Sequence, residues 1–161
     1  MTLEMNKKKI FNDPVYGFVS VPYGILFELV EHPYFQRLRR IRQLGLTDYV
    51  YPGALHTRFH HALGALHLMG QAIGVLRSKG VAISPAEEEA VSIAILLHDI
   101  GHGPISHALE HTLVNVHHEL LSLFFMQVRN EQFDGRLDLA IRIFENRYAK
   151  PFLHQLISGK L

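Results

Sequence analysis

The sequence of 161 residues has 48% hydrophobic and 19% charged side chains and a formal net charge of +1. This balance suits one folded domain rather than a disordered chain. The absence of cysteine excludes disulfide scaffolds, thiolate metal sites and cysteine nucleophiles, and the near-neutral charge provides no general basic field for nucleic acid. No apolar run approaches the ~20 residues of a membrane span and the start carries no secretory signal, so we expect a cytoplasmic protein without a membrane partner.

The first expected element is a short β-hairpin over about residues 9–21. Candidate strand residues flank the pair Asp13 and Pro14, which is typical of a turn. Pro22 ends this segment, and helix signals dominate from Tyr23 onward. We interpret the turn at Asp13 and Pro14 as structural.

Seven or eight helices are expected after the hairpin. The clearest start is residues 84–87 (SPAE), a capping box with proline at the first helical position. The helix that follows becomes apolar nearly all round, so its end must be buried, and it breaks at Gly101 or Gly103. The other expected helices cover residues 24–31, 34–43, 58–79, 104–113, 116–129, 137–148 and 152–158.

This pattern predicts an all-α fold, a helical bundle of about seven or eight helices with a short N-terminal hairpin. We expect a single domain over residues 1–161, with its helical core over about 23–161. No internal repeat or low-complexity segment divides the chain.

Histidine is the unusual component of the sequence, because six of the 12 histidines fall between His98 and His118. Histidine is the commonest metal ligand and the usual acid or base near neutral pH. Asp99 follows an apolar run and His98, and an ionised carboxylate is almost never fully buried unless it is paired or bound to metal. These two side chains can share one ion only near the helix end, where Gly101 and Gly103 turn the chain away.

The alternative is structural: Asp99 accepts backbone hydrogen bonds from the next helix start, and His98 is a satisfied core histidine. The clustering of other histidines near this pair in the sequence favours the metal interpretation. With His61, at the start of a long helix, the pair makes a nitrogen and oxygen site that suits iron, manganese, nickel, zinc or magnesium. We expect one such divalent ion, with the remaining histidines moving protons and stabilising charge around it.

Five stretches of the sequence carry a resemblance to a known family: residues 13–17 (DPVYG), 35–45 (FQRLRRIRQLG), 51–54 (YPGA), 58–64 (RFHHALG) and 97–107 (LHDIGHGPISH). The chain resembles the HD phosphohydrolase superfamily, whose motif is His…His-Asp…Asp, and within it the deoxynucleoside triphosphate triphosphohydrolase branch. The resemblance covers residues 13 to about 120. It implies that water attacks the α-phosphorus of the nucleotide and that triphosphate is released.

The resemblance also implies roles for individual residues. His61, His98 and Asp99 would hold the metal. Gln43 would contact the sugar, and Arg58 would contact the triphosphate, which its guanidinium fork suits. The residues implied for the catalytic pocket are His102, His107, His118, Glu110 and Glu119.

Two features depart from the family pattern. The second aspartate of the motif, which is the fourth metal ligand, has no match, and the downstream candidates Asp134 and Asp138 follow no family motif. We therefore expect a fragment of a longer protein, truncated at its C-terminus relative to the family. Glu110 stands where the family often has aspartate, which keeps the charge but alters the reach.

Three interpretations of function follow. The first is a metal-dependent phosphohydrolase with a nucleotide substrate, most specifically a deoxynucleoside triphosphate. The second is an HD-type nucleotidase or phosphodiesterase, because the shared metal ligands do not choose among these chemistries. The third is an inactive, metal-poor HD module that lacks the fourth ligand.

Two expectations concern partners. Because relatives in this branch assemble, we expect a homo-oligomer. A cluster of basic side chains would allow nucleic acid as a partner without requiring it, and we interpret it as a solvated helix face with structural ion pairs: Arg37, Arg39, Arg40 and Arg42.

Overall fold

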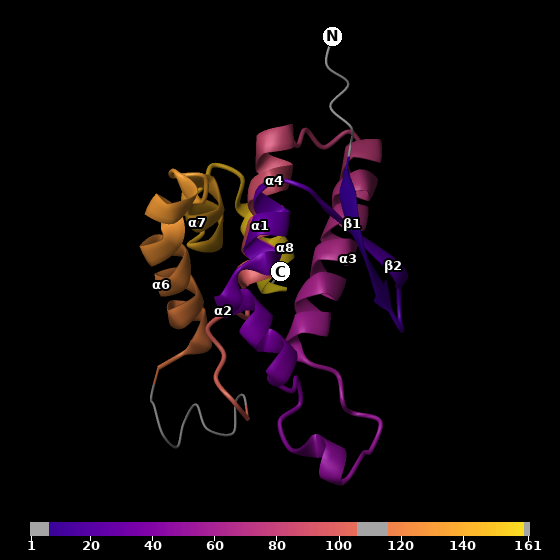
Figure 1. Cartoon of the computed structure of the whole chain (residues 1–161). Coiled ribbons are helices and arrows are strands. Elements are labelled where there is room, and N and C mark those ends of the chain that lie inside the picture. Colours follow the sequence, from indigo (N-terminus) through magenta and orange to yellow (C-terminus); the bar gives the residue numbers. More distant parts are fainter. Residues whose placement is uncertain (1–6, 106–115, 160–161) are drawn as a thin grey trace.

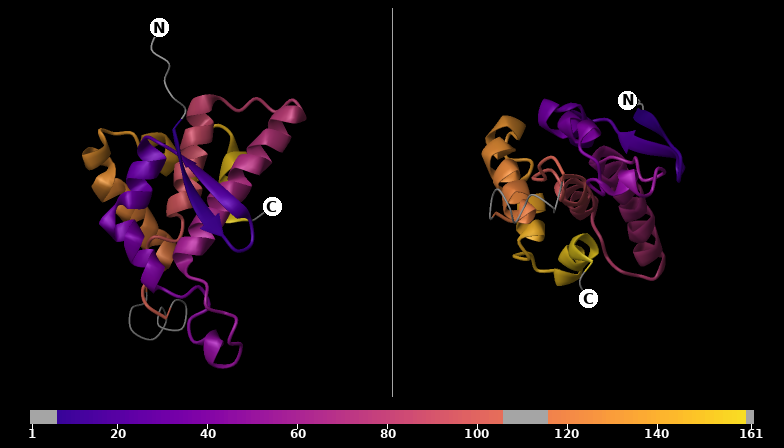
Figure 2. Two further views of the ribbon diagram at one scale, coloured as in Figure 1. Left: turned by 45° about the vertical axis from the view of Figure 1, so that its right-hand side comes forward. Right: turned by 90° about the horizontal axis from the view of Figure 1, so that it is seen from below.

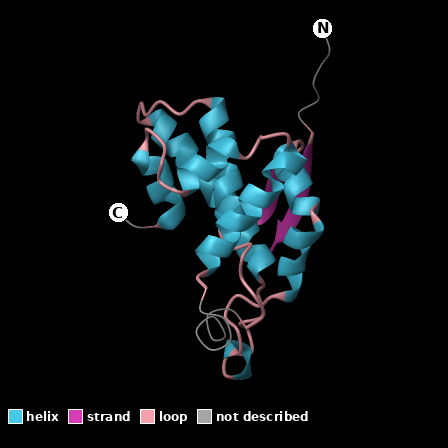
Figure 3. Ribbon diagram, turned by 90° about the vertical axis from the view of Figure 1, so that its left-hand side faces the viewer, coloured by secondary structure: helices cyan, strands magenta, loops and turns pink. Residues whose placement is uncertain are grey.

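The structure is a computed structural model that describes residues 7–105 and 116–159, and this part is mainly helical (Figure 1). Its two strands lie together on one side of the helical body (Figure 3). The predicted all-α fold with an N-terminal hairpin is confirmed. The described α-helices are α1 (Ile25–Glu31), α2 (Pro33–Gln36), α3 (Arg58–Ser78), α4 (Pro85–Leu97), α6 (His118–Asn130), α7 (Asp138–Phe144) and α8 (Pro151–Ser158). Three short 3₁₀ helices accompany them: η1 (Arg37–Arg40), η2 (Thr47–Tyr49) and η3 (Glu131–Phe133).

The N-terminal hairpin pairs β1 (Lys8–Asp13) with β2 (Gly17–Pro22) in antiparallel register. Its turn is held by the Asp13 carboxylate, which accepts hydrogen bonds from the backbone N–H groups of Val15 (2.8 Å) and Tyr16 (3.0 Å). This local bonding is the reason that aspartate favours turns. Alternate residues of β2 are buried, and the strand packs against α1 and α3.

Helix α4 lies at the centre of the helical body, between α3 and α7 (Figure 2). Every residue from Ala90 to Leu97 is buried, as the all-round apolar pattern predicts. Each large aliphatic side chain buried in this way stabilises the fold by about 1.5–3 kcal/mol. The end of α4 therefore lies in the interior of the domain. His98 follows it directly as the C-cap residue, so the chain turns away from the helix at a buried point.

The helix predicted over residues 34–43 is shorter than expected. The α-helical part ends at Gln36, the 3₁₀ helix η1 follows, and Ile41 is extended with φ −110° and ψ 114°. Tertiary pairing replaces the helix, because the carbonyl of Ile41 accepts from the N–H of Arg58 (2.8 Å) and Gln43 donates its N–H to the carbonyl of His56 (3.0 Å). This pairing fixes the segment before α3 and hence the position of the first turn of α3.

Two further predicted helices differ from the structure or lie largely outside its described part. The helix predicted over 137–148 ends at Phe144, and Asn146 adopts a positive φ of 56°, which asparagine tolerates better than most residues. The helix predicted over 104–113 lies almost wholly outside the described residues. Within the described part of the chain, no helix is long and apolar enough to cross a membrane.

The predicted capping box at the start of α4 is present. Ser84 Oγ accepts from the N–H of Glu87 (3.2 Å), and the Glu87 carboxylate accepts from the N–H of Ser84 (2.8 Å). Glu87 is also buried, and it accepts hydrogen bonds from Tyr148 Oη (2.7 Å) and Lys150 Nζ (2.9 Å). This carboxylate thus joins the start of α4 to the segment between α7 and α8, a long-range contact that its place in an acidic first turn does not reveal.

The Glu87 network predicts how stability depends on pH. The hydrogen bond from Lys150 is the main cause that lowers the pKa of Glu87 from 4.5 to about 2. Because the folded pKa lies below the unfolded value, the stabilisation is fully present above pH 4.5 and is lost as the pH falls towards 2. We expect Glu87→Gln to cost about 1–3 kcal/mol at neutral pH and progressively less in acid.

Denaturant unfolding across this pH range, followed by circular dichroism, tests the prediction. Glu89→Gln is the matched control, because Glu89 lies on the same helix but is exposed. A difference between the wild-type protein and Glu87→Gln that stays constant down to pH 2 would contradict the assigned role.

Candidate metal centre

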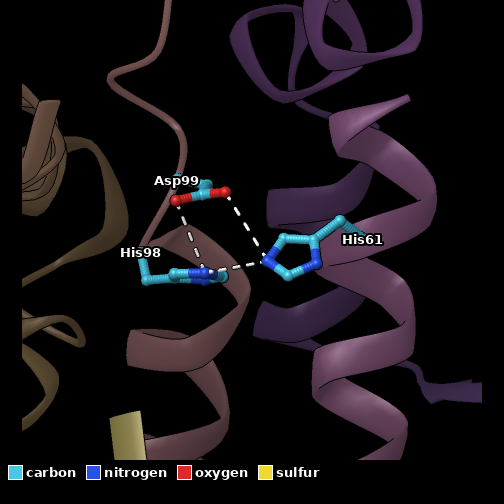
Figure 4. Close-up of side chains that lie close together, drawn as sticks. All are labelled: His61, His98 and Asp99. Carbon is cyan, nitrogen blue, oxygen red and sulfur yellow. Dashed lines mark hydrogen bonds and ion pairs between the residues drawn. The ribbon is translucent and has the colours of Figure 1, made fainter. Parts of the chain in front are cut away.

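Three side chains predicted as metal ligands meet between α3 and the end of α4 (Figure 4). His61 extends from the first part of α3, while His98 caps α4 and Asp99 follows it. The Nε2 atoms of His61 and His98 are 3.2 Å apart. The Asp99 carboxylate approaches both rings, with Oδ2 at 3.6 Å from His61 Nε2 and Oδ1 at 3.4 Å from His98 Nε2.

These separations fit one shared ion. Two ligand atoms that each lie about 2.1 Å from an ion are about 3.0 Å apart at a right angle and about 3.4 Å apart at a tetrahedral angle. The spacings among His61, His98 and Asp99 are of this size. Two imidazole nitrogens and a carboxylate suit a divalent ion of intermediate or hard character. The donor set therefore fits the metal that the sequence predicts, and it does not choose among iron, manganese, nickel, zinc and magnesium.

The orientation of His98 also suits a ligand. Its Nδ1 lies 2.6 Å from the carbonyl oxygen of Ile95. A carbonyl can only accept, so Nδ1 carries the proton of this bond, and the neutral ring then presents the lone pair of Nε2 to His61 and Asp99. Metal-ligating histidines typically donate their other N–H in this way.

Asp99 is buried, with 5% of its surface exposed, and it pairs with the buried Arg58. Burial acts to raise the pKa of Asp99, but the interaction with His102, the nearby His98 ring and the positive charge of Arg58 together outweigh it and hold this pKa well below its usual range. The carboxylate is therefore ionised near neutral pH. Arg58 and His61 are three residues apart on α3, so both face the end of α4.

The surroundings of His61 favour the neutral form of its ring. Burial lowers the pKa of His61 from its ordinary value of 6.5, and the attraction of Asp99 opposes this only in part. A neutral imidazole is the form that binds a metal, whereas a protonated ring must first release its proton.

His102 and His118 form a second group of possible ligands with the same carboxylate. His102 is buried and its Nε2 lies 3.4 Å from Asp99 Oδ1, while burial lowers the pKa of its ring. The rings of His102 and His118 stack nearly parallel, 3.8 Å apart with an angle of 19°. The rings of His61 and His98 are instead tilted by 58° with their Nε2 atoms facing each other. The group of His61, His98 and Asp99 is therefore the better candidate for a single ion, and the stacked pair lies next to it.

The turn after Asp99 needs glycine. A Cβ atom added to Gly101 would clash with the carbonyl oxygen of His118 and lie 2.6 Å from the backbone nitrogen of Ser122. Side chains are excluded there because α6 passes directly over this residue. The close approach brings His118, at the first position of α6, next to His102.

The remaining predicted site residues have several outcomes. His118 and Glu119 line a cavity of about 180 Å³ together with His98, and His154 of α8, which we did not predict for the site, lines it too. The Gln43 side-chain oxygen is buried and has no hydrogen-bond partner among the described residues. His107 and Glu110 lie outside the described part of the chain.

The two downstream aspartates are not brought to this centre. Asp138 accepts a hydrogen bond from the Asn130 amide (2.6 Å), and Asp134 has a left-handed backbone conformation at the end of η3. Neither belongs to the groups of possible metal ligands found among the described residues. The group that contains His61 has three members, His61, His98 and Asp99. Sequence alone also did not reveal that Arg58 pairs with Asp99.

A buried helix that ends in a His–Asp pair, facing a histidine of the neighbouring helix, defines the class of helical domains that hold a divalent metal through histidine and aspartate. The family model described as HD domain matches residues 58–150, more than half of the chain. The chain belongs to this family.

Several known proteins are similar to this chain. The deoxynucleoside triphosphate triphosphohydrolase SAMHD1 of Gallus gallus is 42% identical over 104 residues, which cover 63% of this chain and 17% of that protein. An uncharacterized protein of Mycoplasma pneumoniae is 36% identical over 94% of this chain and 40% of its own length. The crystal structure of a phosphohydrolase from Bacteroides thetaiotaomicron has a TM-score of 0.91 and 56% identity, and covers 94% of this chain and 38% of that one. The chain thus spans less than half of the length of each of these relatives.

The contact at Gly101 predicts that Gly101→Ala displaces α6 from the turn. We expect a loss of about 1–3 kcal/mol in the free energy of unfolding, because the new methyl group meets backbone atoms that cannot rotate away. Gly103→Ala is the control, since a Cβ atom at Gly103 meets no described residue within 4 Å. Urea denaturation of both variants measures the difference, and equal stability of the two would refute the close approach.

Proposed function

We propose that this chain forms the metal-binding core of a phosphohydrolase that hydrolyses a deoxynucleoside triphosphate to a nucleoside and triphosphate. The observation that carries the proposal is the convergence of His61, His98 and Asp99 on one point beside the buried Arg58. Membership of the HD family and similarity to triphosphohydrolases support the choice of substrate.

In this proposal His61, His98 and Asp99 hold the ion, which supplies Lewis acidity to a phosphoryl oxygen when it is bound. Arg58 holds the Asp99 carboxylate in place and also contacts the triphosphate. A guanidinium group has five N–H donors, so it can serve a carboxylate and a phosphate together. Gln43 contacts the sugar, for which its buried amide oxygen supplies an acceptor.

The reaction also requires proton transfers. Water forms a bond to the α-phosphorus, the bond from this phosphorus to the nucleoside O5′ breaks, and O5′ receives a proton. His102 and the stacked His118 lie beside Asp99, and Glu119 lines the same cavity as His118, so these groups are placed to accept and return the proton. His107 and Glu110 belong to the same proposal.

The products formed from each deoxynucleotide test the proposal. We expect the protein loaded with Mn²⁺ to release nucleoside and inorganic triphosphate, which anion-exchange chromatography separates from the substrate. Release of single phosphate groups would instead support an HD-type nucleotidase, and cleavage of a phosphodiester substrate would support a phosphodiesterase. Tight metal binding without any product would contradict the proposal for this chain.

The metal site itself predicts the effect of removing one ligand. His61→Ala should abolish retention of stoichiometric metal, because two ligands on one loop cannot replace the third from α3. We choose His61 because it is partly exposed, so its removal should spare the fold, whereas a change at Asp99 leaves Arg58 buried without its carboxylate.

His60→Ala is the matched control. The His60 ring is next to His61 in sequence, but it hydrogen-bonds to Thr57 at the start of α3 and not to the candidate metal ligands. Elemental analysis after gel filtration measures the metal. Equal metal content in His61→Ala and His60→Ala would exclude His61 as a ligand. If the wild-type chain itself retains none, the third interpretation, a metal-poor HD module, replaces the proposal.

A further inference from the structure

The loop that carries the candidate ligands, residues 98–102, accepts two hydrogen bonds from an arginine side chain. Arg37, the first residue of η1, donates from Nη1 to the carbonyl of His102 (2.8 Å) and from Nη2 to the carbonyl of Ile100 (2.6 Å). These two carbonyls flank Gly101. Hydrogen bonds from a charged donor are about twice as strong as neutral ones, and the planar fork fixes two acceptors at once.

A serine of α6 holds the same loop through two other backbone groups. Ser122 is fully buried, its Oγ donates to the carbonyl of His98 (2.8 Å), and it accepts from the N–H of Gly101 (2.9 Å). Arg37 and Ser122 together bind three carbonyls and one N–H within five residues of chain. The two candidate ligands of the loop, His98 and Asp99, lie within this hydrogen-bonded segment.

Arg37 and Ser122 are also parts of one connected framework. The Arg37 guanidinium lies 4.5 Å from the centre of the Tyr34 ring. Tyr34 in turn stacks on Phe125, with the ring centres 5.0 Å apart and an angle of 15°. Phe125 and Ser122 both belong to α6. This helix therefore supports the contacts of Arg37 with the loop as well as those of Ser122.

We propose that Arg37 and Ser122 are positioning residues that preset the metal-binding geometry of His98 and Asp99. This inference rests on the proposed metal centre. His98 and Asp99 are consecutive, so the directions of their side chains follow from the backbone angles of this loop. Glycine at 101, and at 103 directly after the loop, allows this segment many conformations, and the hydrogen bonds of Arg37 and Ser122 restrict them. The arginine cluster of the sequence therefore contains one member that acts on the site.

Metal affinity distinguishes positioning from a general role in folding. Supporting residues around a metal site change metal affinity by about 10- to 100-fold when they are replaced. We expect Arg37→Lys and Ser122→Ala each to weaken Mn²⁺ binding to the metal-free protein at least tenfold in isothermal titration calorimetry. Lysine keeps the charge of Arg37 but lacks the fork that spans two carbonyls.

Matched controls are available for both variants. Arg40→Lys changes an exposed arginine of the same 3₁₀ helix, and Ser78→Ala removes an exposed hydroxyl that donates to the carbonyl of Val75 in its own helix. Both should bind Mn²⁺ as the wild type does. Methylguanidinium added to Arg37→Ala should restore affinity, which a merely structural loss would not allow.

The outcomes separate the two proposals. Wild-type affinity in both Arg37→Lys and Ser122→Ala, with only the melting temperature lowered, would overturn the positioning role and leave the metal centre intact. Absence of Mn²⁺ binding by the wild-type chain would overturn the metal centre and the positioning role with it. If one variant does not fold, the other gives the same decision, because each grips the loop through different backbone groups.

Discussion

The buried carboxylate of Asp99 is the constraint on which the rest of this structure depends. An ionised carboxylate in an apolar interior is unfavourable by several kcal/mol unless other charges and hydrogen bonds compensate. Arg58 pairs with it, His102 lies beside it, and His61 and His98 face it from two helices. The apolar helix α4 ends two residues earlier, at Leu97, and fixes the depth of this charge.

Much of the fold follows from local signals. The capping box, the hairpin turn and the apolar α4 are each determined by residues close together in sequence, and each is present. The predicted helix over 34–43 was wrong in its second half, because Ile41 pairs with the start of α3 instead of continuing the helix. Periodicity describes one segment at a time and cannot include such a distant partner.

The candidate site shows the same division. Two of the three candidate ligands, His98 and Asp99, are conspicuous in the sequence because they follow an apolar run, and the structure brings their side chains close to the third candidate, His61. Other contacts could not be foreseen. Arg37 meets the carbonyl of His102 across 65 residues of sequence, and Arg58, expected to contact phosphate, is paired with Asp99. Arginine side chains are long enough to reach many acceptors, so only the folded chain shows which one is bound.

Anomalous scattering from crystals soaked in Mn²⁺ would show where the ion binds. We expect one strong peak about 2.1–2.3 Å from the Nε2 atoms of His61 and His98 and from an Asp99 carboxylate oxygen. A peak at His102 and His118 instead, or Mn²⁺ binding that leaves His61 out, would contradict it.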